Sequence, residues 1–133
     1  MNLEKLQNLI HKEKIELVNC NMHNTKARII QDNKNSFIFI NRKQIENTTE
    51  EKCILAEEMG HYYCDALYSP LYYDKQLVDK NEYRANKWAF KTLISKNKLK
   101  KLSKKGYANY EIAEELGVTE ELLKKAYDYY QYN

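Results

Sequence analysis

The chain has 133 residues, a formal net charge of +3, three glycines and one proline. This length allows one domain with a modest core and excludes two independent domains. A content of 43% hydrophobic and 31% charged residues is typical of a helix-rich soluble protein and argues against a disordered chain or a β-sandwich. The small positive charge gives only weak support for a nucleic-acid partner.

The N-terminus begins directly with an amphipathic pattern, and no apolar run approaches the length of a membrane span. We therefore expect a cytoplasmic protein with no membrane partner. Cys20, Cys53 and Cys64 form no C-x-x-C pair, so buried free thiols are favoured over a disulfide framework or a zinc finger.

The first forty residues predict a helix followed by a small sheet. Leucine and isoleucine recur at helical spacing over about 3–13. Runs rich in β-branched and aromatic residues at 15–18, 27–30 and 36–40 predict three strands, and the polar turn at 32–35 joins the last two as a hairpin. We expect an antiparallel sheet.

Two long helices are predicted next. Thr48 and Glu51 form a capping box that opens a helix over about 49–67, which Ser69-Pro70 terminates. A second capping box, Asp79 with Glu82, opens a helix that runs through about Ser95.

The C-terminal part is predicted to be helical and lysine-rich. Six lysines fall between residues 96 and 105, and such a run is most often a solvated helix face, with an acidic or nucleic-acid partner as the alternative. Two short helices near 110–116 and 120–130, the second capped by Thr119, have helix-turn-helix spacing. The second helix opens with Glu120 and Glu121, which would repel phosphates, so packing on the core is favoured over DNA contact.

The most specific pattern is Glu57-Glu58-Met59-Gly60-His61. It matches the zinc-protease signature H-E-x-x-H with glutamate in place of the first histidine. In the full motif both histidines bind Zn²⁺ and the glutamate activates the metal-bound water. Glutamate can also bind zinc, so Glu57 is a candidate ligand, with Asp65 and Cys64 on or near the same helix face. The alternative is an amphipathic helix with a surface Glu-Glu pair and a hydrogen-bonded core His61.

The segment Leu55–His61, followed about twenty residues later by Glu82–Ala89, resembles the ImmA/IrrE family of metallopeptidases. Members carry a "LAHELGH" helix and then an "E-x-x-A-N-x-F-A" helix, and Trp88 stands where phenylalanine is usual. The resemblance covers most of residues 1–95. It implies an α+β, helix-rich, zincin-like minimal metallopeptidase fold with a small three-stranded sheet and a helix-turn-helix-like C-terminal pair.

Carried over residue by residue, the resemblance implies that His61 and Glu82 are metal ligands and that Glu58 is the general base. Glu57 occupies the first ligand position, where the family has histidine. Zn²⁺ is the expected ion, although harder donors allow another divalent metal such as Mn²⁺ to compete. Glu82 has a second interpretation, because a glutamate at the third position of a capping box needs no metal.

We therefore expect one compact domain, with a metallopeptidase-like core at 1–95 and a helical segment at 96–133 packed on it. The expected function is zinc-dependent cleavage of a protein or peptide, such as a helix-turn-helix repressor of a phage or mobile element. The strand edge near 37–40 would pair with an extended substrate. The alternative is a catalytically inactive relative that binds a regulatory protein or nucleic acid.

Overall fold

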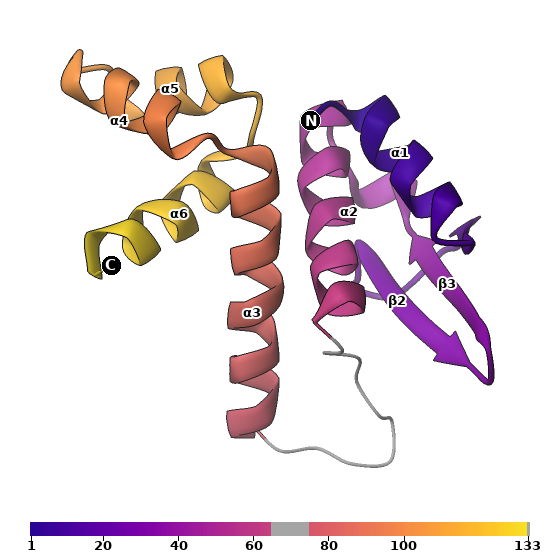
Figure 1. Cartoon of the computed structure of the whole chain (residues 1–133). Coiled ribbons are helices and arrows are strands. Elements are labelled where there is room, and N and C mark those ends of the chain that lie inside the picture. The colour runs from indigo at the N-terminus through magenta and orange to yellow at the C-terminus, as the bar shows by residue number, and fades with distance from the viewer. Residues whose placement is uncertain (65–74, 133) are drawn as a thin grey trace.

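The computed structural model describes residues 1–64 and 75–132. Within these residues it contains six α-helices, one short 3₁₀ turn and three strands, which confirms the α+β class (Figure 1). In chain order the elements are α1 (Leu3–Lys12), β1 (Ile15–Asn19), β2 (Ala27–Asp32), β3 (Asn35–Ile40), η1 (Arg42–Gln44), α2 (Thr48–Tyr63), α3 (Lys75–Leu93), α4 (Lys96–Lys104), α5 (Asn109–Leu116) and α6 (Glu120–Tyr132).

The three strands form one mixed sheet in the order β1-β3-β2. The predicted hairpin is confirmed, because β2 pairs antiparallel with β3 and Asn33 adopts the left-handed conformation in the turn (φ 55°). The prediction of an antiparallel sheet is wrong for β1, which runs parallel to β3. Local sequence patterns report strand propensity, whereas the direction of β1 depends on how the chain crosses back between β1 and β2.

The position of β3 also corrects the predicted substrate edge. Strand β3 contains residues 37–40 and is hydrogen-bonded on both sides, so it has no free edge for a peptide. Within residues 1–64 and 75–132, strand β2 is paired with β3 alone, and it lies against α2. The edge of the sheet next to the candidate site is therefore β2.

Both long helices begin earlier than predicted: α2 begins at Thr48 and not at about residue 49, and α3 begins at Lys75 and not after Asp79. Asn47, and not Thr48, caps α2, because its side chain accepts a hydrogen bond from the Glu50 backbone N–H at 2.8 Å. Asp79 lies inside α3, so the predicted cap there is wrong. Helix α2 ends at Tyr63, and the predicted stop at Ser69-Pro70 lies outside the described residues.

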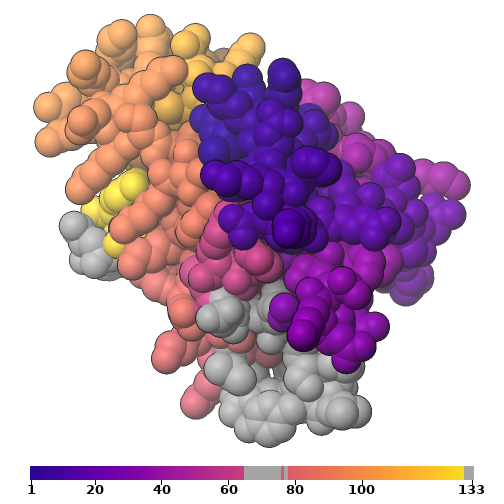
Figure 2. Space-filling view, turned by 45° about the vertical axis from the view of Figure 1, so that its right-hand side comes forward, coloured from indigo at the N-terminus to yellow at the C-terminus, as the bar shows by residue number. Residues whose placement is uncertain are grey.

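Helix α2 lies between the two halves of the molecule (Figure 1). On one side it contacts α1 and β2, and on the other it packs along α3. In the space-filling view the N-terminal segment and the later helices form one continuous body (Figure 2). One hydrophobic cluster joins both halves; its fully buried large side chains are Leu6, Ile38, Ile40, Leu55, Met59, Ile112, Leu122 and Leu123.

The C-terminal helices pack on this body through apolar residues. The lysine run is a helix, α4, whose Leu99 and Leu102 are buried while its lysines are exposed. Thr119 caps α6 as predicted, its hydroxyl accepting from the Leu122 N–H at 3.2 Å. Helix α6 packs on α3. Among the described residues, no helix combines the length and the apolar character needed to cross a bilayer.

Candidate active site

A glycine sets the distance between the two helices that carry the candidate ligands. A Cβ atom built on Gly60 would lie 2.3 Å from the carbonyl oxygen of Ala85. Real Cβ atoms do not approach so closely, so only glycine permits this contact between α2 and α3. The contact lies one residue from His61 in α2 and three residues from Glu82 in α3, and it therefore brings these two side chains within reach of each other.

His61 and Glu82 meet across the two helices. The His61 Nε2 atom lies 3.2 Å from the Glu82 Oε1 atom, and the two side chains are 5% and 46% exposed. The imidazole is thus buried in the protein, while the carboxylate faces both the imidazole and solvent. An imidazole and a carboxylate converging from separate helices are a typical pair of donors for a zinc site.

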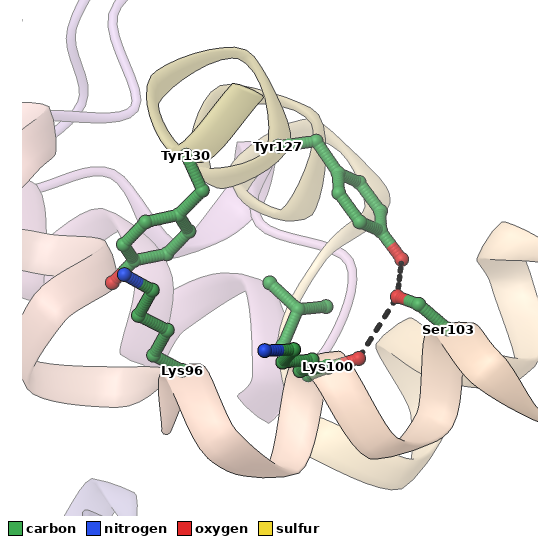
Figure 3. A pocket seen from close by; sticks show the side chains of 6 residues that line it. Lys96, Lys100, Ser103, Tyr127 and Tyr130 are labelled. Carbon is green, nitrogen blue, oxygen red and sulfur yellow. Dashed lines mark hydrogen bonds between the residues drawn. The ribbon is translucent and has the colours of Figure 1, made fainter. Parts of the chain in front are cut away.

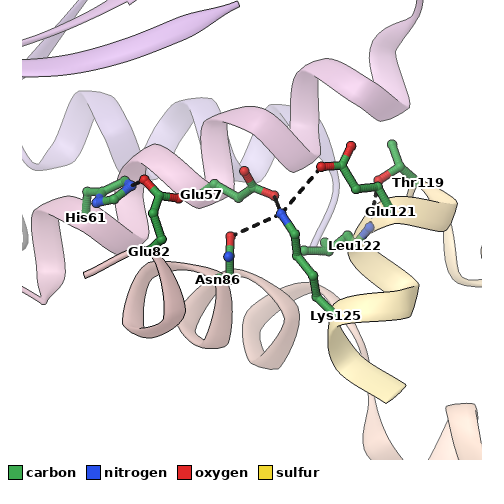
Figure 4. A network of polar contacts seen from close by, with 8 residues as sticks. All are labelled: Glu57, His61, Glu82, Asn86, Thr119, Glu121, Leu122 and Lys125. Atoms are coloured by element: carbon green, nitrogen blue, oxygen red, sulfur yellow. Dashed lines mark hydrogen bonds and ion pairs between the residues drawn. The ribbon is translucent and has the colours of Figure 1, made fainter. Parts of the chain in front are cut away.

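Glu57 is directed away from this pair. Its carboxylate Oε1 lies 3.4 Å from the Nζ atom of Lys125 in α6, which also donates to the side-chain oxygen of Asn86 at 3.4 Å (Figure 4). Glu121 extends the network, with its carboxylate 3.6 Å from the same ammonium. The pKa of Glu57 is raised by burial and further by Glu121 and Glu82, while Lys125 opposes the rise.

Glu58 is anchored to the sheet. Its carboxylate accepts a hydrogen bond from the Ile29 backbone N–H of β2 at 2.8 Å. Burial raises the pKa of Glu58 to about 7; nearby His61 and the Ile29 N–H act in the opposite direction, and the charges of Glu57 and Glu82 add to the rise. A carboxyl group with a pKa near neutrality can accept and return a proton at physiological pH.

A solvent-accessible cavity of about 350 Å³ gives access to both motif glutamates. It lies where α2 faces β2 and the start of α6, and its lining residues are Lys26, Ala27, Glu50, Cys53, Ile54, Glu57, Glu58, Thr119 and Glu121. Lys26 pairs with Glu50 at 3.0 Å at its rim. Cys53 is the only one of the three free cysteines that is buried, and burial raises its thiol pKa. The cavity therefore joins the β2 edge to the motif helix.

A larger cavity of about 570 Å³ lies between α4 and α6 (Figure 3). Its walls are largely apolar, and Lys96 Nζ lies 5.2 Å from the centre of the Tyr130 ring. Ser103 and Tyr127 share a hydrogen bond of 2.7 Å on another wall. The described residues that line it carry no carboxylate or imidazole.

The residues of the motif partly fit a zinc ion. His61 and Glu82 are close enough to share one ion, whereas the Glu57 carboxylate is bound to an ammonium. In residues 1–64 and 75–132 no three His, Cys, Asp or Glu side chains form a group that could hold a metal. Asp65 lies outside the described residues. A third donor from the motif thus requires Glu57 to leave Lys125.

Lys125 and Asn86 were not identified as part of the site from the sequence. Asn86 belongs to the second motif block, and Lys125 follows Glu121 by four residues, a spacing that indicates an ion pair on one helix face. Neither signal indicates that α6 places an ammonium against α2, because that contact depends on how α6 packs across α3. The hydrogen bond from the Ile29 backbone N–H to Glu58 was likewise not predicted, since every residue except proline has a backbone N–H and its partner leaves no pattern in the sequence.

One comparison with known proteins gave a match. A family model described as the IrrE N-terminal-like domain, of the M78 peptidase family, matches residues 10–127. The match includes α2, α3 and most of α6, and with them every residue of the polar network. Searches of curated proteins and of solved structures gave no significant match.

Proposed function

Because the chain belongs to the IrrE N-terminal-like family of peptidases, we propose that it is a metal-dependent peptidase that hydrolyses a protein or peptide substrate. The observation that carries this proposal is the pairing of His61 with Glu82 at 3.2 Å, from two helices held together by a glycine contact. Glu58, which lines the adjoining cavity, supplies a carboxyl group that titrates near neutrality.

His61 and Glu82 would hold the ion, with Glu57 as third donor after its release from Lys125. Zinc is the first candidate, and when bound it would polarise the scissile carbonyl and lower the pKa of water. Glu58 would accept the proton of the attacking water and return it to the leaving amine. The Ile29 N–H fixes the orientation of that carboxylate, since it holds one of its two oxygens.

The β2 edge supports an extended peptide as substrate. Ala27 of β2 and the preceding Lys26 line the cavity together with the motif glutamates. A peptide that added to this edge would pass beside Glu58, and its backbone would gain hydrogen bonds from the strand. A helix-turn-helix repressor of a phage or mobile element is the proposed natural substrate, and the cytoplasm, where such repressors act, is the proposed location.

The test is a cleavage assay with zinc and such a repressor, followed by intact mass spectrometry. The wild type should give two fragments, and Glu58→Gln should give none at equal zinc content. Glu114→Gln, which removes an exposed carboxylate of α5, is the matched control and should cleave normally. Equal cleavage by wild type and Glu58→Gln would contradict the proposed role of Glu58.

A second function is favoured by one observation, the engagement of Glu57 by Lys125. With that carboxylate neutralised by an ammonium, the site is stable without a metal, and the chain would act as an inactive relative that binds a regulatory protein. This alternative predicts a repressor complex that survives both zinc chelation and Glu58→Gln, without fragments. Binding to DNA that weakened steeply with salt would indicate nucleic acid as the partner.

A further inference from the structure

Lys125 is the cation at the centre of the candidate site. Its side chain is 32% exposed and contacts three helices: Glu57 of α2, Asn86 of α3 and Glu121 of its own helix. It is therefore not a freely solvated surface lysine, and its contacts extend beyond the pair with Glu121 on its own helix. The contacts tie α6 to the two helices that carry the predicted ligands.

The surroundings of this ammonium are acidic. The charges of Glu121 and Glu82 act on the Glu57 carboxylate, and Glu58 follows Glu57 directly in α2. The Glu57 side chain is only 27% exposed, and a carboxylate that is partly buried beside other carboxylates depends on a nearby positive charge. The positive charge beside the Glu57, Glu82 and Glu121 carboxylates can be supplied by Lys125 or, with His61 as a further ligand, by a divalent ion.

A metal ion and the ammonium compete for the Glu57 carboxylate. A metal ion bound by a carboxylate oxygen lies about 2 Å from it, and the ammonium lies 3.4 Å from the Glu57 Oε1 atom. Two positive charges on one partly buried carboxylate repel each other. The ammonium at Glu57 therefore opposes the use of this carboxylate as a metal ligand beside His61 and Glu82.

We propose that Lys125 is a protein-borne competitor of the metal, so that α6 controls the metal affinity of the site through the Glu57 carboxylate. The proposal rests on the proposed function, because it takes His61 and Glu82 as the other donors. It assigns a regulatory role to α6: any partner or substrate that draws Lys125 away from Glu57 would favour metal binding.

The experiment measures Zn²⁺ affinity at neutral pH by competition with a chromophoric chelator. The site-specific component is the one that Glu82→Gln removes. Lys125→Met, which keeps the length of the side chain, should bind zinc at least roughly tenfold more tightly than wild type, a change typical of groups that act on a ligand. Lys125→Arg keeps the charge and should match wild type, as should Lys124→Met, the exposed neighbour on α6.

Amide hydrogen exchange supplies a readout other than affinity. Saturating zinc should increase exchange in α6 of the wild type, because the tie to Glu57 is lost, and should leave α6 of Lys125→Met unchanged. Equal affinity of wild type and Lys125→Met would overturn the inference and leave the proposed function standing. The double variant Glu57→His/Lys125→Met restores the family motif and removes the ammonium. If even this variant showed no Glu82-dependent zinc binding, the inference about Lys125 and the proposed metal-dependent function would both be contradicted.

Discussion

The buried carboxyl group of Glu58 makes the stability of the fold depend on pH in a specific direction. In the folded chain its pKa is about 7, against an ordinary value of 4.5 for the unfolded chain. Between these values the folded state binds more protons than the unfolded state, so the free energy of unfolding falls as pH rises. The difference of 2.5 units, at about 1.4 kcal/mol per unit, corresponds to roughly 3 kcal/mol.

Glu58→Gln isolates this contribution. Glutamine has the same shape, its amide oxygen can still accept the Ile29 N–H bond, and it carries no charge at any pH. At pH 4.5 the variant and the wild type should differ by less than about 1 kcal/mol, because Glu58 is mostly protonated in the folded chain. At pH 8 the variant should be more stable by roughly 3 kcal/mol, since it avoids a buried carboxylate.

The assay is urea unfolding followed by circular dichroism between pH 4.5 and 8, in buffer with a metal chelator. Glu114→Gln on α5 is the control, because it removes an exposed carboxylate and should follow the wild type at every pH. Parallel stability curves for wild type and Glu58→Gln would refute the reasoning. A variant that lost stability at pH 8 would show that the Glu58 carboxylate is stabilised in the fold, contrary to the effect of its burial.

Two further experiments test the helix contact and the polar network. Gly60→Ala should destabilise the fold by about 2 kcal/mol in urea unfolding, because the Cβ clash with Ala85 outweighs a helix-propensity gain of about 1 kcal/mol; equal or greater stability would show that α2 and α3 can separate freely. A double-mutant cycle of Glu57→Gln and Lys125→Met, measured with a metal chelator, should give a coupling of about 1 kcal/mol for this partly buried pair. Additive effects would show that the pair contributes nothing to stability.

The sequence predicted most elements of this fold, because their signals are local. Amphipathic spacing located the helices, and β-branched runs located the strands. Errors arose where local signals compete or are silent. Asn47 and Thr48 are adjacent cap-forming residues, and only the path of the chain decides between them. The parallel direction of β1 and the central place of β3 depend on a crossover that no short pattern encodes.

The candidate site also combines features that the sequence predicts with features that only tertiary packing determines. The resemblance of two motif blocks to the ImmA/IrrE family implied that His61 and Glu82 come together, and the close contact at Gly60 explains how the helices achieve it. Lys125 lies 68 positions after Glu57 in the chain. Its contact depends on the angle at which α6 crosses α3, which follows from tertiary packing and not from any local pattern.

The glutamate at motif position 57 and Lys125 are best understood as a pair. A histidine at position 57 would leave the ammonium without its closest carboxylate partner, and the ammonium would then oppose a bound metal. A glutamate at the same position without Lys125 would be a buried carboxylate beside Glu58 and Glu82. Each residue makes the other tolerable, so restoring histidine alone would not recreate the site of a typical zinc peptidase.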